Sequence, residues 1–263
     1  MAFDLVTAQA FVKSVDLSGV PRGISAMGAA ADAEAGAVFD KAKAQAQIVG
    51  SGVFSFSQGV DAEVREAIAD SALLAQLVAS KRTKFEANPV GWFNAYAEVL
   101  TAVGWTLQEN GWTDYATNGA SAEVNKKIME VLTAVLAPAA GAAVILTATV
   151  KALADMDAGS PWFKLFDRES RKANVSRFQV GLVSTEANGD IFVSMLVCVV
   201  QAQSTLTQVL FFKFNTSTAS FTANNSKVSL NRVALKDLGP SIRAKTRFYQ
   251  ADYLSAILDL PPV

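Results

Sequence analysis

The stretch Asp190-IFVSMLVCVVQAQSTLTQVLFF-Lys213 decides the fold, because it contains no internal charge and is the richest part of the chain in β-branched and aromatic residues. It predicts two buried strands, over residues 191–202 and 207–215, joined by a turn. Both faces of the first strand are apolar, and such a strand needs a layer of structure on each side of its sheet. We therefore expect the helical half of the chain to cover at least one side of it.

Further strands are predicted on both sides of this stretch. Asn188-Gly189, before residue 191, is a strong signal for a hairpin turn. Asn224-Asn225 is expected to be another turn, and together these signals predict an antiparallel meander. The predicted strands cover residues 177–185, 191–202, 207–215, 218–222 and 227–232.

Helical periodicity dominates the earlier part of the chain. Asn88-Pro89 predicts an N-cap followed by proline in the first helical position. A final amphipathic helix is expected to begin after Gly239-Pro240 and to dock on the sheet. Residues 49–60 are expected to be a connector or a short edge strand. The predicted helices cover residues 3–15, 25–48, 61–80, 89–108 and 241–258.

These elements predict an α+β fold, in which a helical N-terminal layer packs on an antiparallel β-meander with a C-terminal helix. Gly159-Ser-Pro161 and the charged run DRESRK (Asp167–Lys172) mark the boundary between two parts. Residues 1–158 form the mainly helical part, and residues 173–263 form the sheet and the last helix. With 51% hydrophobic residues, the chain has enough material for one continuous globular unit.

The lack of histidine excludes many kinds of catalytic site. It removes the Ser-His-Asp and Cys-His arrangements and the usual ligands of zinc and non-haem iron. No Asp or Glu lies between Asp190 and Asp237, so the predicted strands of this region cannot supply a pair of catalytic carboxylates. We expect no catalytic residues, no metal site and no enzyme activity; an enzyme that uses carboxylates or lysine is a third alternative.

Charge and cysteine content limit partners and location. The net charge is −1 without any long run of Lys or Arg, which argues against nucleic acid as a partner. Residues 232–247 form a weakly basic region that would meet anionic lipid headgroups or simply be solvated. The single cysteine cannot form an internal disulfide. Because Met-Ala-Phe-Asp lacks a basic n-region, we expect a cytoplasmic protein that either stays there or is released without a signal peptide.

A second uncharged stretch covers residues 131–150. As one helix it would be long enough to span about 30 Å of hydrocarbon. Pro138 and Gly141 predict a kink or a split into a hairpin. The stretch is therefore either a buried helix of the helical layer or a hydrophobic hairpin that is stored in the fold and can enter a bilayer. The candidate membrane-active residues are Val131, Leu132, Val135, Leu136, Val144, Ile145 and Leu146.

Cys198 lies in the middle of the central strand, between two valines. A buried thiol in such a strand commonly acts as a small, inert hydrophobic side chain. Alternatively, an apolar cavity around it would shelter a covalently attached fatty acyl chain, whose burial contributes about 0.8 kcal/mol per CH₂ group. The candidate residues of this lipid cavity are Phe192, Leu196 and Val200.

A helical first part, an antiparallel sheet and the lone cysteine within FVSMLVCVV (Phe192–Val200) together resemble the bacterial insect-gut virulence factor Evf, whose buried cysteine carries palmitate. Only Cys198 carries over, as a candidate palmitoylation site. The resemblance implies a non-enzymatic virulence factor or insecticidal-type toxin that acts at membranes or through a bound lipid. Residues 131–150 also resemble the hydrophobic hairpin of helical pore-forming toxins. The alternative is a structural or interaction module of a secreted or phage-like assembly.

Overall fold

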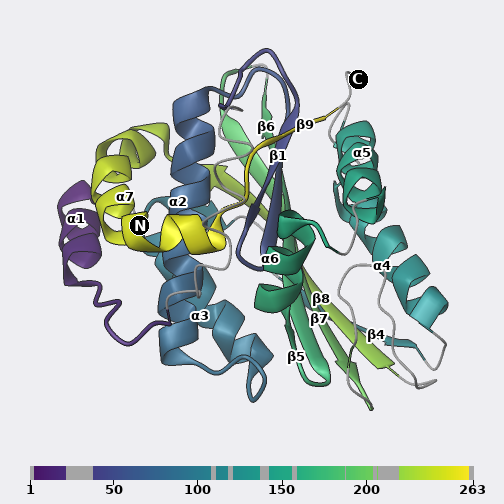
Figure 1. The fold of residues 1–263 in the computed structure, drawn as a ribbon. Coiled ribbons are helices and arrows are strands. Elements are labelled where there is room, and N and C mark those ends of the chain that lie inside the picture. The colour runs from purple at the N-terminus through teal and green to yellow at the C-terminus, as the bar shows by residue number, and fades with distance from the viewer. Residues whose placement is uncertain are drawn as a thin grey trace.

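The computed structural model describes residues 3–21, 38–107, 111–117, 121–136, 142–155, 159–186, 188–203, 206 and 219–260. Figure 1 shows a central sheet with helices on both of its faces. The described helices are α1 (Leu5–Ser14), α2 (Ala62–Arg82), α3 (Pro89–Ala102), α4 (Ser121–Leu136), α5 (Ala142–Asp155), α6 (Pro161–Ser170) and α7 (Arg232–Tyr253). The described strands are β1 (Gln45–Val49), β2 (Gly52–Phe56), β3 (Trp105–Leu107), β4 (Gly111–Thr117), β5 (Arg171–Lys172), β6 (Val175–Thr185), β7 (Ile191–Ala202), β8 (Ala219–Leu230) and β9 (Leu258–Asp259).

Within these ranges the strands form one mixed, mostly antiparallel sheet. Its order is β3-β8-β7-β6-β2-β1-β9, with β4 also paired to β8 and β5 to β6. Strands β6, β7 and β8 form an antiparallel meander, whereas β2 pairs with β6 in parallel. The expected α+β class with a C-terminal helix is confirmed, and strands from both ends of the chain contribute to the same sheet.

The sheet separates two hydrophobic cores, because successive side chains of a strand point to opposite faces. On one face, Val193, Met195 and Val199 of β7 belong to the core that α2, α3 and α7 cover. On the other face, Leu196 and Cys198 belong to the core under α4, α5 and α6. The prediction that helices cover the central strand is therefore confirmed, and on both sides.

Arg65 connects α2 to the beginning of the sheet. Its side chain is fully buried, and four of its N–H groups donate hydrogen bonds. The acceptors are the backbone carbonyls of Lys43, Ser57 and Val60 and the side-chain oxygen of Gln45, at 2.7–2.9 Å. The guanidinium thus holds the ends of β1 and β2 against the first turn of α2.

Several predicted elements of the first half are confirmed, and three are wrong in part. Helices α1 and α2 match their predicted ranges. Residues 38–48 are predicted to be helical, but 38–44 form a loop and 45–48 lie in β1, since pairing with β2 and β9 overrides an Ala-rich propensity. Residues 52–56 form an interior strand rather than an edge strand. The helix predicted over 89–108 ends at Ala102, because Gly104 adopts a φ of +98° and β3 follows.

In the second half, β6 and β7 confirm the predicted strands. The predicted turn at Asn224-Asn225 is wrong, because both residues lie inside the continuous strand β8. Helix α7 begins at Arg232 rather than after Pro240, which lies within it. The Asn231 side chain caps this helix by accepting a hydrogen bond from the Ala234 backbone. The predicted strand over 207–215 and residues 25–37 of a predicted helix lie outside the described residues.

Candidate functional site

Cys198 is packed into the core under α4 and α6. The thiol is fully buried, and its residue pairs with Phe178 of β6 and Ala223 of β8. Burial raises the pKa of the Cys198 thiol well above its ordinary value, so the thiol is protonated and weakly reactive at neutral pH. Leu196 and Val200 lie in the same core. Phe192 lies near the start of β7 instead, where the Lys227 ammonium is 4.5 Å from the centroid of its ring.

The uncharged stretch 131–150 is shared between α4 and α5, so it is not one helix. Figure 1 shows the two helices following one another along one face of the sheet. Their inward side chains Val131, Leu132, Ile145 and Leu146 are buried. Val135 is half-buried and Val144 is 51% exposed, whereas the Leu136 side chain lies outside the described part. Within the described ranges, no helix combines the length and hydropathy that crossing a membrane requires.

The outer surface of these two helices carries no charge over the second part of α4 and the first part of α5. No Asp, Glu, Lys or Arg occurs between Glu130 and Lys151, and among the described side chains of this stretch the exposed ones are Thr133, Ala134, Val144 and Thr147. The opposite side of the same two helices packs on the sheet and contributes to the hydrophobic core that contains Cys198. We call α4 (Ser121–Leu136) and α5 (Ala142–Asp155) together the outer helix pair.

A pair of hydroxyl groups connects the outer helix pair to the sheet. Ser55 Oγ of β2 lies 2.8 Å from Thr149 Oγ1 of α5, and both side chains are buried. The Thr149 hydroxyl donates its hydrogen to the Ile145 carbonyl, so Ser55 is the donor to Thr149. A polar contact thus fixes α5 over a specific point of β2.

The structure also contains a cavity that the sequence did not predict, of about 290 Å³, between α2, α7, β1 and residues 38–39. Its polar lining residues are Gln47, Glu66, Asp70, Arg243 and Gln250. Its apolar lining residues are Val38, Phe39, Ala69, Leu254 and Ile257. We call it the α2/α7 cavity. Its volume is close to the lower end of the range of small-molecule sites.

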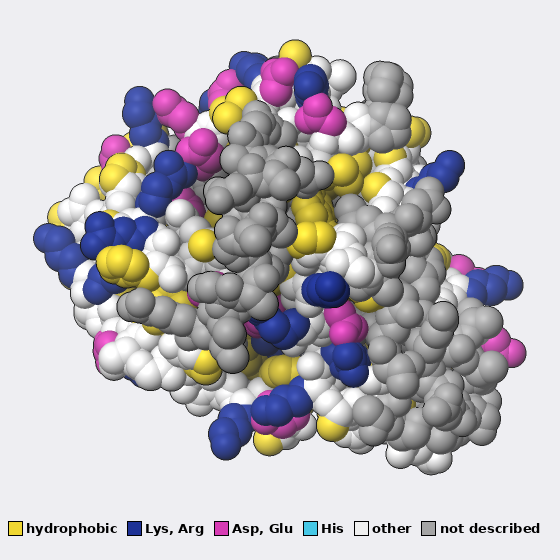
Figure 2. Space-filling view, viewed as in Figure 1, with side chains coloured by type: hydrophobic (Ala, Val, Ile, Leu, Met, Phe, Trp, Pro, Cys, Tyr) yellow, Lys and Arg dark blue, Asp and Glu magenta, His cyan; other side chains and the backbone are white. Residues whose placement is uncertain are grey.

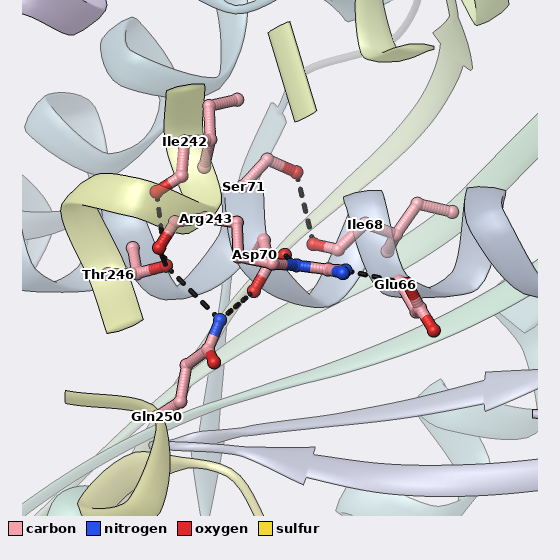
Figure 3. A network of polar contacts seen from close by, with 8 residues as sticks. All are labelled: Glu66, Ile68, Asp70, Ser71, Ile242, Arg243, Thr246 and Gln250. Atoms are coloured by element: carbon pink, nitrogen blue, oxygen red, sulfur yellow. Dashed lines mark hydrogen bonds and ion pairs between the residues drawn. The ribbon is translucent and has the colours of Figure 1, made fainter. Parts of the chain in front are cut away.

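Two carboxylates and one guanidinium form the polar wall of the α2/α7 cavity (Figure 3). Glu66 and Asp70 are four residues apart on α2 and therefore lie on the same face of that helix. Arg243 of α7 bridges them, with Nε 2.9 Å from Asp70 Oδ2 and Nη2 2.7 Å from Glu66 Oε2. Gln250 donates to Asp70 Oδ1 at 2.7 Å. Although burial raises the pKa of Asp70, both of its oxygens accept hydrogen bonds, as in an ionised carboxylate.

Gln47 of β1 is a lining residue of this cavity, and its side-chain oxygen is a buried acceptor that solvent does not reach. The side chain is 7% exposed, and its Nε2 donates to the Ser255 carbonyl at 2.9 Å. That bond fixes the orientation of the amide, because two oxygens cannot face one another without a hydrogen between them. Among the described residues, Gln47 Oε1 has no hydrogen-bond partner. A buried acceptor without a donor costs about 1–3 kcal/mol.

The sequence contained only part of the signal for this cavity. Glu66 and Asp70 lie at helical spacing in a helix that was predicted, and so do Arg243 and Gln250. Nothing in the sequence indicated that these two helices pack against each other. Gln47, moreover, was assigned to a helix rather than to β1.

Two of the five bases in the weakly basic region 232–247 pair with carboxylates of α2 and its N-cap, and a third donates to backbone carbonyls. Arg232 pairs with Asp61 at 2.8 Å, and Arg243 pairs with the two carboxylates of α2. Lys245 donates to the backbone carbonyls of Lys13 and Val15 at 2.8 Å. Figure 2 shows basic and acidic side chains mixed over the part of the surface where α2 and α7 lie.

No protein-family model matches the chain, and no curated protein matches its sequence. Among solved structures, a delta-endotoxin is similar with a TM-score of 0.40 and 10% identity, over 68% of this chain and 81% of that chain. The structure of the Evf virulence factor is similar with a TM-score of 0.33 and 9% identity, over 82% of this chain and 86% of that chain. The resemblance to Evf in sequence layout thus corresponds to a weak structural similarity without a shared sequence family.

Proposed function

We propose that this chain is a non-enzymatic virulence factor or toxin that acts at membranes, with the outer helix pair as its membrane-directed element. The observation that carries the proposal is the outer surface of this pair, where the described residues between 131 and 136 and between 142 and 150 carry no charge. Helices that have no charged residues over such a length can approach the headgroup region without removing charges from water.

The arrangement of the pair suits a surface-binding role better than a spanning one. Glu123, Lys126 and Glu130 precede the uncharged stretch and Lys151 follows it, so the charges lie towards the two ends of the pair. Helix α4 has 16 residues and α5 has 14, fewer than the roughly 20 that cross the hydrocarbon core, so the pair would lie in the membrane interface rather than span the bilayer. If the pair leaves the sheet, the side chains that it buries there can pack against the acyl chains of the membrane instead.

Release from the sheet has a cost that the membrane must offset. Val124, Ile128, Leu132 and Leu146 would lose their contacts with the sheet, and apolar surface exposed to water costs about 25 cal/mol per Å². Insertion of the same side chains among acyl chains recovers this free energy. The proposal therefore requires a membrane for stable release.

A disulfide between α5 and β2 tests this step. Because Ser55 Oγ and Thr149 Oγ1 are 2.8 Å apart, sulfurs in their places can bond after a small shift. We expect the reduced Ser55→Cys/Thr149→Cys protein to release dye from vesicles of phosphatidylcholine and phosphatidylglycerol. The oxidised protein should lose this activity, and dithiothreitol should restore it.

The single variant Ser55→Cys is the matched control, because it carries the new thiol but cannot form the cross-link; both variants also carry Cys198→Ala, since release of the pair would expose that thiol. Equal leakage from the oxidised and reduced double variant would rule out release of the pair. If the wild-type protein neither binds nor permeabilises vesicles at acidic or neutral pH, the alternative takes its place: a structural or interaction module whose uncharged surface binds another protein.

A further inference from the structure

We infer that residues 256–260 form a strap that holds α5 on the sheet, and that detachment of this strap controls release of the outer helix pair. The strap contains β9 and lies along β1 at one border of the sheet (Figure 1). This regulation presupposes the proposed function, because it concerns the same two helices. Three features carry it: the contacts of the strap with α5, its short attachment to β1, and the few other contacts that fix α5.

The strap supplies much of the apolar surface beside α5. Ile145 of α5 belongs to a small hydrophobic cluster that is separate from the two main cores. The other buried members are Ala44, Ala46, Leu182 and Leu260, and Ala148 and Leu258 pack against them. Because the alanines are small, Leu182 of β6 and the two strap leucines are the large side chains beside Ile145. Detachment of the strap would therefore uncover Ile145 to water.

The strap is firmly fixed at its beginning only. Ser255, which precedes it, is buried and makes three hydrogen bonds, through its N–H to the Ile48 carbonyl, through its hydroxyl oxygen from the Ile48 N–H and through its carbonyl from Gln47 Nε2, at 2.9–3.0 Å. Within the described residues, the ladder that follows has two residue pairs, Gln45 with Asp259 and Ala46 with Leu258. Such a short edge ladder opens more easily than the interior of a sheet, so Ser255 can act as a hinge.

The side chains of the strap add little to this attachment. Asp259 accepts hydrogen bonds from Lys43 Nζ at 2.6 Å and from Gln45 Nε2 at 2.7 Å. The Asp259 side chain is 46% exposed, and ion pairs at such exposed positions contribute little to stability. Ile257 lines the α2/α7 cavity, so on that side it borders free volume rather than packed atoms. The strap can therefore detach while the interior strands stay paired.

Helix α5 keeps two other connections when the strap detaches. Thr149 still contacts the Ser55 hydroxyl, and Leu146 and Val150 still lie in the core that contains Cys198. Detachment of the strap thus raises the fraction of molecules in which α5 has left the sheet, without unfolding the protein. This expectation distinguishes a controlling strap from side chains that merely stabilise the whole fold.

The test measures opening of α5 in water, so it does not depend on any membrane activity. The reporter is Thr149→Cys in a Cys198→Ala background, because Thr149 is 1% exposed and lies between α5 and β2. Leu258→Ala/Leu260→Ala removes the strap leucines and retains the backbone pairing. We expect an aromatic disulfide reagent to label the reporter at least about tenfold faster in this variant than with the native strap. If the double substitution prevents folding, as judged by circular dichroism, Leu260→Ala alone decides.

Two controls separate local opening from general loss of stability. Ile257→Ala shortens a neighbouring strap side chain that lines the α2/α7 cavity and is not a member of the Ile145 cluster, so labelling should change by less than about threefold. Met195→Cys in the Cys198→Ala background reports on the α2 side, and its labelling should not respond to the strap leucines. Equal acceleration at both reporters, or unchanged labelling of Thr149→Cys, would overturn the inference.

Vesicle leakage then separates the strap from the proposed function. If both hold, Leu258→Ala/Leu260→Ala should release dye from vesicles of phosphatidylcholine and phosphatidylglycerol at a lower protein concentration than the wild-type protein does. Faster labelling without any leakage supports the strap and contradicts the membrane function. Leakage by the wild-type protein together with unchanged labelling contradicts the strap and leaves the membrane function in place.

Discussion

Two buried arginines illustrate how different surroundings accommodate the same side chain. Arg65 donates four hydrogen bonds, whereas Arg177 of β6 lies between two aromatic rings, 3.4 Å from the ring centroid of Trp92 and 4.4 Å from that of Phe85. Arg177 donates one hydrogen bond, to Ser51, and its Nε has no partner among the described residues. Burial lowers the pKa of Arg65 to about 10 and that of Arg177 to about 9.

These surroundings predict opposite outcomes for the same substitution. Arg65→Met leaves four acceptors without their donor and should lower the free energy of unfolding by at least about 3 kcal/mol. Arg177→Met removes a poorly compensated buried charge and retains an apolar chain between the rings, so stability should change by less than about 1 kcal/mol or increase. Urea unfolding at neutral pH measures both values. Equal losses in the two variants would contradict this account of Arg177.

At the scale of single elements, Gly181 of β6 makes the parallel pairing with β2 possible. Phe54 of β2 lies directly opposite Gly181, and a Cβ atom on that glycine would be only 2.7 Å from Phe54 Cδ1. The flat ring therefore lies over a position without a side chain. Both residues are buried, so the ring cannot move outward easily.

This contact predicts a coupled pair of substitutions. Gly181→Ala should lower the free energy of unfolding by about 1–3 kcal/mol through overpacking. Phe54→Leu replaces the ring with a smaller side chain, so the loss caused by Gly181→Ala should be smaller in that background. A double-mutant cycle measured by thermal or urea unfolding gives the coupling. Strictly additive effects would show that the ring does not limit the space at Gly181.

The elements also show where sequence reasoning succeeds. Strand β7 and helix α2 have patterns strong enough to fix their type, and the burial of Cys198 follows from its apolar neighbours. Strand β1 could not be predicted in this way, because its glutamines and alanines form a strand only through pairing with β2 and β9. The composition around Asn224 predicts a turn, yet pairing with β4 and β7 on its two sides keeps this residue extended.

Of the two candidate sites, one could be predicted from the sequence and the other could not. The uncharged character of 131–150 is a local property, so the sequence alone revealed it. The α2/α7 cavity depends on the packing of Glu66 and Asp70 against Arg243, which is far away in the sequence. Helical spacing shows which residues share one face of a helix, but it does not show which other element packs against that face.

At the scale of the whole molecule, the sheet divides the core into two parts that need not have the same stability. The α2 side contains a helix with fourteen buried residues. The outer helix pair covers the opposite side, where β7 presents Cys198. If the pair opens as the proposed function requires, the two faces of β7 should become accessible at different rates.

Thiol labelling can measure this difference. Cys198 is a native reporter for the side of the outer helix pair, and Met195→Cys with Cys198→Ala is the matched reporter for the α2 side; Cys198 and Met195 are 0% and 2% exposed. We expect an aromatic disulfide reagent to label Cys198 faster, with a weaker dependence on urea, because local opening exposes less surface than global unfolding. Identical rates and urea dependences would show that both sides open only by global unfolding.

The connection of β1 and β2 to late parts of the chain has a consequence for biosynthesis. Gly52 of β2 pairs with Gln179 of β6, and Ala46 of β1 pairs with Leu258 of β9. Non-local pairing of this kind folds slowly, because large loops must close first. When the first hairpin leaves the ribosome, its neighbours have not yet been translated and its edges are open to association with other chains. We therefore expect the nascent polypeptide to depend on chaperones until its last residues emerge.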